Sequence, residues 1–351
     1  MTPPPNPNPR NRLKAAAANL GLLAATVLLL LGIFEGTLRL SGFSYVLYPQ
    51  DIEFGMPNPV VLKAGFQEDD DLFWVTQDYD AKLERLRRQR PTWVLLGDSC
   101  TDLGGYDEAL AERAAGRGKA LRYGNLGVAG WSSFQGRRQL ERDVPPLGPE
   151  VVTIYFGWND HWIGFGIDDA NVARVKRVFS SRWSRLRLVQ LATKTRVAWD
   201  ARGSGLPNRV ALPDFEANLR AMVAQARSLD AVPVLLTAPS NHEPGEEPAA
   251  LGERWLRDVS ELVPLHRAYV DAVRRVAGDT GAPLCDLARR FDALDKPQRN
   301  SLFMTDGIHP NADGDRFVAS ALDACFERDG LWTRLLGSTE PQPPERPSTV
   351  P

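Results

Sequence analysis

Short apolar segments, each ending in polar or glycine residues, recur along the chain from residue 92 to residue 288. They are Thr92–Ser99, Ala120–Gly130, Glu150–Asp160, Ala231–Asn241 and Ala282–Ala288. The stretches between them include residues 106–117, 134–144, 212–229 and 265–281, which have the apolar spacing of amphipathic helices. Apolar strands that alternate with such helices predict a parallel sheet covered by helices on both faces. We therefore expect an α/β fold built on five parallel strands.

The first four expected strands each end, at the carboxyl side, in residue types that commonly act in catalysis or ligand binding. These ends are Asp98–Ser99, Gly127–Ser132, Gly157–Asp160 and Ser240–Asn241. In parallel sheets, ligands bind beyond the carboxyl ends of the strands. The sequence therefore predicts one site at this edge of the sheet.

The segment Ala15–Phe34 is almost uniformly apolar, with Asn19 as its one clearly polar residue. Twenty residues in a helix span roughly 30 Å, the thickness of a bilayer core. Three basic residues precede it: Arg10, Arg12 and Lys14. This asymmetry predicts a single-pass anchor over residues 15–34, a disordered cytoplasmic tail over 1–14, and a catalytic domain outside the cytoplasm. A cleaved signal peptide is the alternative, but the residues after the apolar run offer a poor cleavage site.

The remaining chain divides into three expected parts. Residues 35–90 are interpreted as a juxtamembrane segment, residues 91–336 as the main domain, and the proline-rich residues 337–351 as a disordered tail. Residues 161–211 interrupt the strand–helix alternation as a basic insertion. Among the residues of this insertion are Arg174, Lys176, Arg177, Arg182, Arg185, Arg187, Lys194 and Arg196. We weigh two interpretations of the insertion: a solvated helical excursion, or a contact with anionic lipid headgroups or an anionic polymer.

Composition excludes several classes of function. The net charge of −2 gives no global reason to expect a nucleic-acid partner. The three cysteines, Cys100, Cys285 and Cys325, allow at most one pair, and the four histidines lie far apart. This spacing argues against a disulfide scaffold and a zinc site, so we expect no metal and no cofactor.

A serine, a histidine and an acid are available in the order Ser99, Asp306, His309. Asp306 and His309 are three residues apart just before an expected helix over residues 312–330, a spacing that places both side chains on one side of a turn. The aspartate accepts the imidazole N–H, which leaves the other ring nitrogen free to act as a base. A serine hydroxyl needs such a base to become a nucleophile. Taken alone, Ser99 is better explained as a helix cap.

Acyl transfer also needs hydrogen-bond donors for the developing oxyanion. Three groups are candidates: the Ser99 amide at a strand-to-helix turn, the Gly130 amide, and the side chain of Asn159. Each signal is weak alone. Their order, with each at a strand end or before the last helix, makes the combination strong.

Aromatic residues cluster around the second and third strand ends. Trp131, Trp158 and His161 are candidate substrate contacts, with His161 expected at the rim of the site. Plain packing is an equally good explanation for the tryptophans.

These blocks resemble the SGNH, or GDSL-type, serine hydrolase superfamily, and in particular its membrane-anchored bacterial members. The matching residues are Gly97–Ser99, the segment ending at Gly130, the segment containing Asn159, and Asp306 with His309. The resemblance implies a flavodoxin-like three-layer α/β/α fold with strand order 2-1-3-4-5. It also implies a Ser99–His309–Asp306 triad and an oxyanion hole formed by Ser99, Gly130 and Asn159. Cys100 stands where the family motif has leucine, a position expected to pack.

We therefore expect a serine esterase that cleaves O-acyl esters, above all acetyl esters, of an extracytoplasmic carbohydrate or lipid through an acyl-enzyme. One alternative is an O-acetyltransferase that modifies an exported polysaccharide with the same acyl-enzyme. The other is a non-enzymatic envelope binding module. The expected partners are the substrate and the membrane, the latter through the anchor and the basic insertion.

Overall fold

The computed structural model describes residues 9–45, 65–118, 120–163, 168–179, 182–204, 207–252 and 255–336. The chain forms two compact units: residues 1–50 with 174–203, and residues 51–173 with 204–351. The expected tail at residues 337–351 and the first eight residues lie outside the described part.

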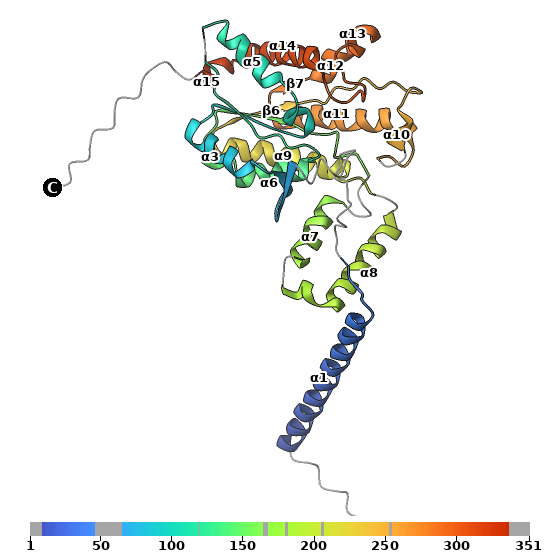
Figure 1. Cartoon of the computed structure of the whole chain (residues 1–351). Helices are drawn as coiled ribbons and strands as arrows, with labels where there is room; N and C mark the ends of the chain where they lie inside the picture. Colours follow the sequence, from blue (N-terminus) through green and yellow to red (C-terminus); the bar gives the residue numbers. More distant parts are fainter. Residues whose placement is uncertain are drawn as a thin grey trace, which may run out of the picture. The chain divides into compact units, whose positions relative to one another are not determined.

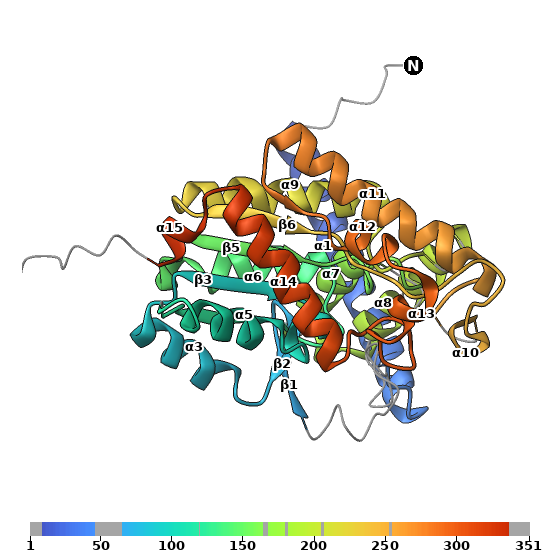
Figure 2. The same ribbon diagram turned by 90° about the horizontal axis from the view of Figure 1, so that it is seen from above.

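The larger unit is built on a five-stranded parallel sheet (Figures 1 and 2). Its strands are β3 (Trp93–Gly97), β4 (Tyr123–Asn125), β5 (Val151–Tyr155), β6 (Val232–Leu236) and β7 (Leu284–Cys285). Their spatial order is β4-β3-β5-β6-β7, which in chain order is 2-1-3-4-5. Every residue of β3 and β5 is buried, as expected for central strands covered on both faces. The predicted fold and strand order are confirmed.

Helices form a layer on each face of the sheet. They are α5 (Tyr106–Ala115), α6 (Ser133–Arg142), α9 (Leu212–Ser228), α11 (Leu262–Thr280) and α14 (Ala312–Arg328). α14 packs beside α5 on one face, and α9 packs between α6 and α11 on the other (Figure 1). Shorter elements complete the unit: α10 (Ala249–Gly252), α12 (Leu287–Asp292), α13 (Lys296–Asn300), α15 (Trp332–Leu335), η1 (Pro145–Leu147) and η3 (Val259–Glu261).

Residues 65–90 belong to the same folded unit as the sheet. They form the antiparallel hairpin of β1 (Phe66–Asp69) and β2 (Phe73–Thr76), followed by α3 (Tyr79–Gln89). The Trp74 indole N–H donates to the carbonyl of Ala129 at 3.1 Å, and the Trp131 indole N–H donates to the carbonyl of Trp74 at 2.9 Å. Tyr79 is fully buried and donates to Asp143 at 2.8 Å. The folded unit therefore begins before residue 91.

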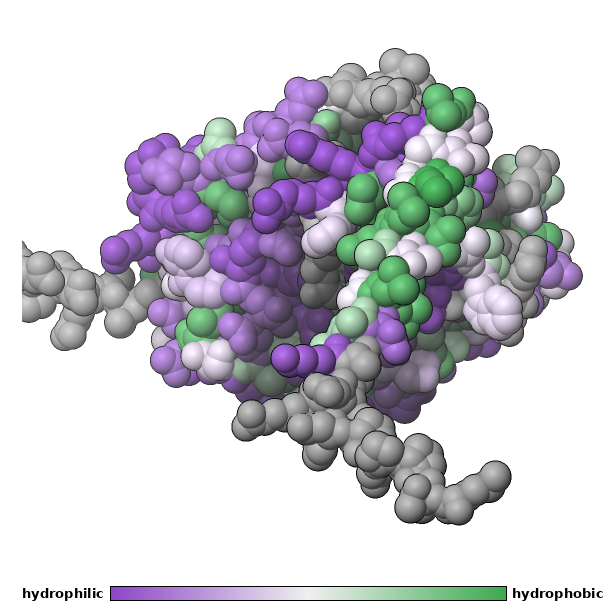
Figure 3. Space-filling view, turned by 90° about the horizontal axis from the view of Figure 1, so that it is seen from below, coloured by the Kyte–Doolittle hydropathy of each residue, from purple (hydrophilic) through white to green (hydrophobic). Residues whose placement is uncertain are grey.

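The smaller unit contains the apolar helix and most of the basic insertion. α1 (Pro9–Leu40) extends beyond the expected residues 15–34, and its segment Ala17–Leu40 is long and apolar enough to cross a membrane. Its large apolar side chains are exposed, from Leu20 at 68% to Phe34 at 47%. The space-filling view of Figure 3 shows a band of hydrophobic residues among hydrophilic ones. The insertion folds into α7 (Asp169–Phe179), η2 (Arg182–Arg185) and α8 (Arg187–Ser204).

Candidate active site

Ser99 is the first residue of α4 (Ser99–Asp102), a short helix that starts directly after the buried strand β3. Asp98 caps this helix, because its carboxylate accepts the N–H of Cys100 at 2.9 Å. N–H groups in the first turn of a helix have no carbonyl partner within the helix. The turn therefore presents both the half-buried hydroxyl and the amide of Ser99 at the carboxyl edge of the sheet. Cys100 is buried, as expected.

Asp306 and His309 lie in the turn before α14. The Asp306 Oδ1 atom accepts the backbone N–H groups of Ile308 at 2.8 Å and His309 at 3.0 Å, which fixes the carboxylate. Its Oδ2 atom lies 2.6 Å from Nδ1 of His309. The His309 Nε2 atom in turn lies 2.7 Å from Oγ of Ser99, 210 residues earlier in the chain. The structure therefore brings together serine, imidazole and carboxylate in one hydrogen-bonded chain.

The pKa shifts of Asp306 and His309 suit a role of His309 as a general base. Burial alone would raise the pKa of Asp306, but hydrogen bonds from the His309 ring and from two backbone N–H groups outweigh it and lower that pKa to about 2. Burial alone would lower the pKa of His309, but the Asp306 carboxylate outweighs it and raises that pKa above its ordinary value. When His309 is neutral, the ionised Asp306 holds its Nδ1 proton, so that Nε2 faces Ser99 as an acceptor.

The loop that carries Gly130 packs against the helix of Ser99. The Val128 N–H donates to the carbonyl of Gly97 at 3.1 Å, and the Ala129 N–H donates to the Asp102 carboxylate at 3.0 Å. Gly130 has a φ of 80°, a left-handed conformation that favours glycine. Ser132 then caps α6. The second block of the predicted site thus lies beside the first.

Arg209 anchors this loop from the far end of the basic insertion. Its guanidinium donates to the carbonyl of Gly130 at 2.6 Å and forms a buried ion pair with Asp169 at 3.0 Å. Asp169 also accepts the hydroxyl of Ser132 at 2.6 Å. Arg209 and Asp169 were not predicted as site residues, because an arginine near a basic run gives no sign in the sequence that it pairs with a buried acid.

Asn159 is 5% exposed, and its side-chain amide donates to the carboxylate of Asp98 at 3.3 Å. Burial raises the pKa of Asp98 to about 6, although the hydrogen bond from Cys100 and the charge of His309 oppose the shift. Asp98 therefore orients the amide of Asn159 as well as capping α4. An amide nitrogen has two hydrogens, so one remains for another acceptor.

The structure places the predicted substrate contacts Trp131, Trp158 and His161 in the core, so His161 does not lie at the rim of the site as expected. All three are buried, at 0%, 2% and 0% exposure respectively. Trp158 stacks on His266 with ring centroids 3.8 Å apart. The Trp131 indole N–H donates a hydrogen bond to the carbonyl of Trp74 in β2. These rings fill the core around the site rather than line its rim.

Three histidines beside the triad have assigned proton positions. The His266 Nε2 atom must donate to the carbonyl of Ala238 at 2.9 Å, so its Nδ1 atom accepts from Nε2 of His161 at 3.1 Å. Burial lowers the pKa of His161 well below its ordinary value and that of His266 to about 4, so both are neutral. His242 donates from Nε2 to the carbonyl of Asp306 at 2.9 Å and thereby supports the acid of the predicted triad.

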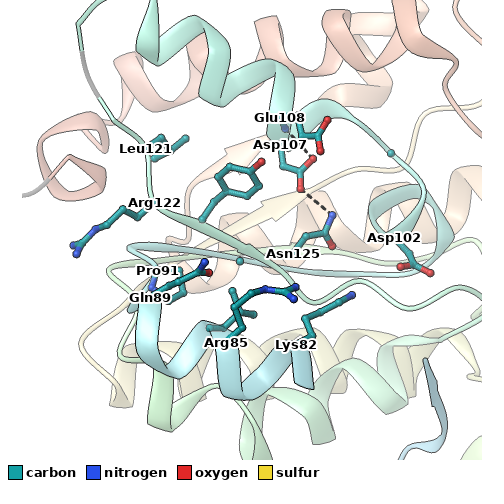
Figure 4. A pocket seen from close by; sticks show the side chains of 14 residues that line it. Lys82, Arg85, Gln89, Pro91, Asp102, Asp107, Glu108, Leu121, Arg122 and Asn125 are labelled. Atoms are coloured by element: carbon teal, nitrogen blue, oxygen red, sulfur yellow. Dashed lines mark hydrogen bonds between the residues drawn. The ribbon is translucent and has the colours of Figure 1, made fainter. Parts of the chain in front are cut away.

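A cavity of about 660 Å³ lies beside the edge strand β4, between α3 and α5 (Figure 4). Lys82 and Arg85 on α3 face Asp107 and Glu108 on α5. Ser99 is not among its lining residues, so this cavity is separate from the triad. Within the described part of the chain, no group of three or more His, Cys, Asp and Glu side chains is placed to hold a metal ion.

Comparisons with known proteins found chains that are similar to this one. An isoamyl acetate-hydrolyzing esterase 1 homolog from Bos taurus is 27% identical over 251 residues, which cover 68% of this chain and 82% of that protein. The crystal structure of the lipase/acylhydrolase from Enterococcus faecalis superposes with a TM-score of 0.46 at 16% identity, covering 68% of this chain and 96% of that one. The acetylxylan esterase Axe2 from Geobacillus stearothermophilus superposes with a TM-score of 0.42 at 18% identity, covering 67% and 93%.

The model of the GDSL-like Lipase/Acylhydrolase family matches residues 95–317, which is more than half of the chain. The match begins within β3, just before Ser99, and extends past His309 into α14. The chain therefore belongs to the GDSL-like lipase/acylhydrolase family, and it is an esterase/acylhydrolase of the GDSL type.

Proposed function

We propose that Ser99, His309 and Asp306 form the catalytic triad of a serine esterase that cleaves acetyl or similarly short acyl esters. The observation that carries the proposal is the distance of 2.7 Å between the Ser99 Oγ and His309 Nε2 atoms, with Asp306 on the other ring nitrogen. A histidine placed in this way removes the serine proton as the hydroxyl attacks an ester carbonyl.

The steps follow from the placement of these groups. His309 takes the proton of Ser99 and returns it to the leaving alcohol, while Ser99 keeps the acyl group. Water then attacks the acyl carbonyl and gives a proton to His309, which passes that proton to the Oγ atom of Ser99 as the acid leaves. The amides of Ser99 and Gly130 and the side chain of Asn159 stabilise the oxyanion in both steps. The preference for a short acyl group is supported by the related esterase of Bos taurus, whose name specifies an acetate ester.

The proposed location of the enzyme is the outer face of a membrane, with the N-terminus in the cytoplasm. This orientation is supported by the apolar run Ala15–Phe34, which lies in a helix long and apolar enough to cross a membrane, and by the basic residues Arg10, Arg12 and Lys14 before it. The substrate would then be an acylated carbohydrate or lipid outside the cytoplasm.

Hydrolysis of p-nitrophenyl esters of increasing acyl length by the full chain in detergent tests the proposal. We expect the highest kcat/KM with the acetate ester and no hydrolysis by Ser99→Ala. The exposed Ser228 on α9 offers a matched control, Ser228→Ala, which should retain full activity. A rate that Ser99→Ala leaves unchanged would contradict the proposal.

The acceptor of the acyl group is tested in the same assay. An oligosaccharide is added together with the acetate ester, and free acetate is compared with acetylated sugar. We expect free acetate to dominate. Acetylated sugar as the main product would identify an O-acetyltransferase that uses the same Ser99 acyl-enzyme.

A further inference from the structure

Glu35, which directly follows the most apolar run of α1, caps the first turn of α8. Its two carboxylate oxygens accept the backbone N–H groups of Arg187 at 3.0 Å and Leu188 at 2.9 Å, more than 150 residues later. A carboxylate is favoured there because first-turn N–H groups lack a helical partner and carry the positive end of the helix dipole. The residue before α8 is Leu186, which has no side-chain acceptor. α1 therefore supplies a cap that the sequence of α8 lacks.

Further hydrogen bonds join the same two segments. The Arg39 guanidinium pairs with Glu35 at 2.7 Å and also donates to the carbonyl of Arg185 at 2.7 Å. The Tyr45 N–H donates to the side-chain oxygen of Gln190 at 3.2 Å. Residues 35–45 and 185–190 thus form one bonded junction, which we call the α1–α8 junction.

The α1–α8 junction fixes the level of the first turn of α8 relative to the apolar helix. Hydrogen bonds of about 3 Å hold the first turn of α8 beside Glu35. If the apolar run up to Phe34 fills the bilayer core, Glu35 lies at the lipid headgroups. The first turn of α8 must then lie at the headgroups too.

η2 directly precedes the first turn of α8, and both η2 and α8 carry exposed tryptophan and basic side chains. Trp183 is 67% exposed and Trp199 is 75% exposed. Exposed basic residues accompany them: Arg182, Arg185, Lys194 and Arg196. No acidic residue occurs from Arg182 to Trp199. Tryptophan is enriched at membrane interfaces, and basic residues are attracted to an anionic membrane surface.

We propose that η2 and α8 form a membrane-surface element that binds anionic phospholipid headgroups in the same bilayer that α1 spans. The inference rests on the proposed placement of α1 in a membrane. It goes beyond that placement because it assigns the basic insertion a lipid partner and assigns Glu35 the task of holding the insertion at the surface. An anionic polysaccharide would explain the exposed basic residues only. Anionic lipid would also explain the exposed tryptophans and the position of the first turn of α8 at the headgroups.

Spin-label accessibility on the full chain in nanodiscs tests this inference. Single cysteines are introduced as Leu28→Cys in α1, Trp183→Cys in η2, and Arg227→Cys on the exposed face of α9 as the control. The native cysteines are all buried, so the label reacts at the new site. Collisions with a water-soluble nickel chelate and with lipid-soluble oxygen are measured in discs with and without phosphatidylglycerol.

We expect the Leu28 label to lose collisions with the chelate, the Arg227 label to keep them, and the Trp183 label to lose them in discs with phosphatidylglycerol. Glu35→Ala should restore chelate collisions at Trp183 without changing those at Leu28. Replacing Arg182, Arg185 and Lys194 by glutamine should weaken the protection that phosphatidylglycerol adds.

Two results would overturn the inference, and a third would separate it from its premise. A buried Leu28 label with a Trp183 label as accessible as Arg227 in both discs refutes the membrane-surface element alone. Protection of Trp183 only after polygalacturonate is added refutes it in favour of a polysaccharide partner. A Leu28 label exposed to the chelate refutes the anchor as well, while leaving the esterase proposal untouched.

Discussion

The guanidinium of Arg209 donates a hydrogen bond to the carbonyl of Gly130 at 2.6 Å, and both residues are buried. This bond links the end of the basic insertion to the loop that holds one proposed oxyanion donor. The same guanidinium pairs with Asp169, which has no other cation within ion-pair distance among the described residues. Arg209 is therefore a positioning residue. The effect of its ion pair with Asp169 can be separated by experiment from the effect of its hydrogen bond to Gly130.

Arg209→Met should lower both stability and kcat. It leaves the Asp169 carboxylate buried and unpaired, which costs about 3–5 kcal/mol of unfolding free energy. Adding Asp169→Asn removes the stranded charge, so the double variant should regain most of that free energy. Its kcat should stay low, because the carbonyl of Gly130 still lacks its donor. Urea unfolding and p-nitrophenyl acetate kinetics measure the two effects, and recovery of both in the double variant would refute the positioning role.

Asn159→Ala should lower kcat by about 10²–10³ with little change in KM, since one oxyanion donor contributes on that order. The exposed Asn300 on α13 provides the control Asn300→Ala, which should leave both constants unchanged. If Asn159→Ala instead raises KM at constant kcat, the side chain binds the ground state and does not belong to the oxyanion hole.

The pH dependence of kcat/KM should show an acidic limb centred above the ordinary histidine pKa of about 6.5. His309 acts as a base only when neutral, and Asp306 raises its pKa, so activity rises with pH through that raised value. Asp306→Asn removes the stabilising charge, so the limb should move to lower pH while kcat falls by about 10⁴. A limb that stays in place in Asp306→Asn would mean that His309 is not the titrating base.

His161→Leu separates packing from substrate binding. The substitution leaves Nδ1 of the buried His266 without its donor, which should cost about 1–3 kcal/mol of unfolding free energy. KM for p-nitrophenyl acetate should not change, because the His161 side chain is fully buried. A raised KM in a variant of unchanged stability would restore the role of His161 at the rim of the site.

Much of the fold follows from local sequence patterns. Strands such as Trp93–Gly97 are apolar over their whole length, and the helices have regular apolar spacing, so both types of element and their order were predictable. Ser99, Gly130, Asn159, Asp306 and His309 each stand at a strand end or before a helix, where parallel-sheet topology gathers side chains. The prediction of one shared site edge therefore needed no knowledge of long-range pairing.

The missed features all depend on pairs that are distant in sequence. Arg209 meets Gly130 across 79 residues, His161 meets His266 across 105, and Glu35 meets Arg187 across 152. Periodicity cannot indicate which charged residue near a basic run turns inward. The hairpin before α3 was not predicted either, because its place in the fold depends on hydrogen bonds of Trp74 with the distant Ala129 and Trp131.

The central claim is that the Ser99 hydroxyl is the nucleophile activated by His309. Labelling of the full chain with a fluorophosphonate, followed by peptide mass analysis, tests this most directly. The account predicts one adduct on the peptide containing Ser99, no adduct in Ser99→Ala, and strongly slowed labelling in His309→Ala. Labelling that persists in Ser99→Ala, or that proceeds at the wild-type rate in His309→Ala, would contradict it.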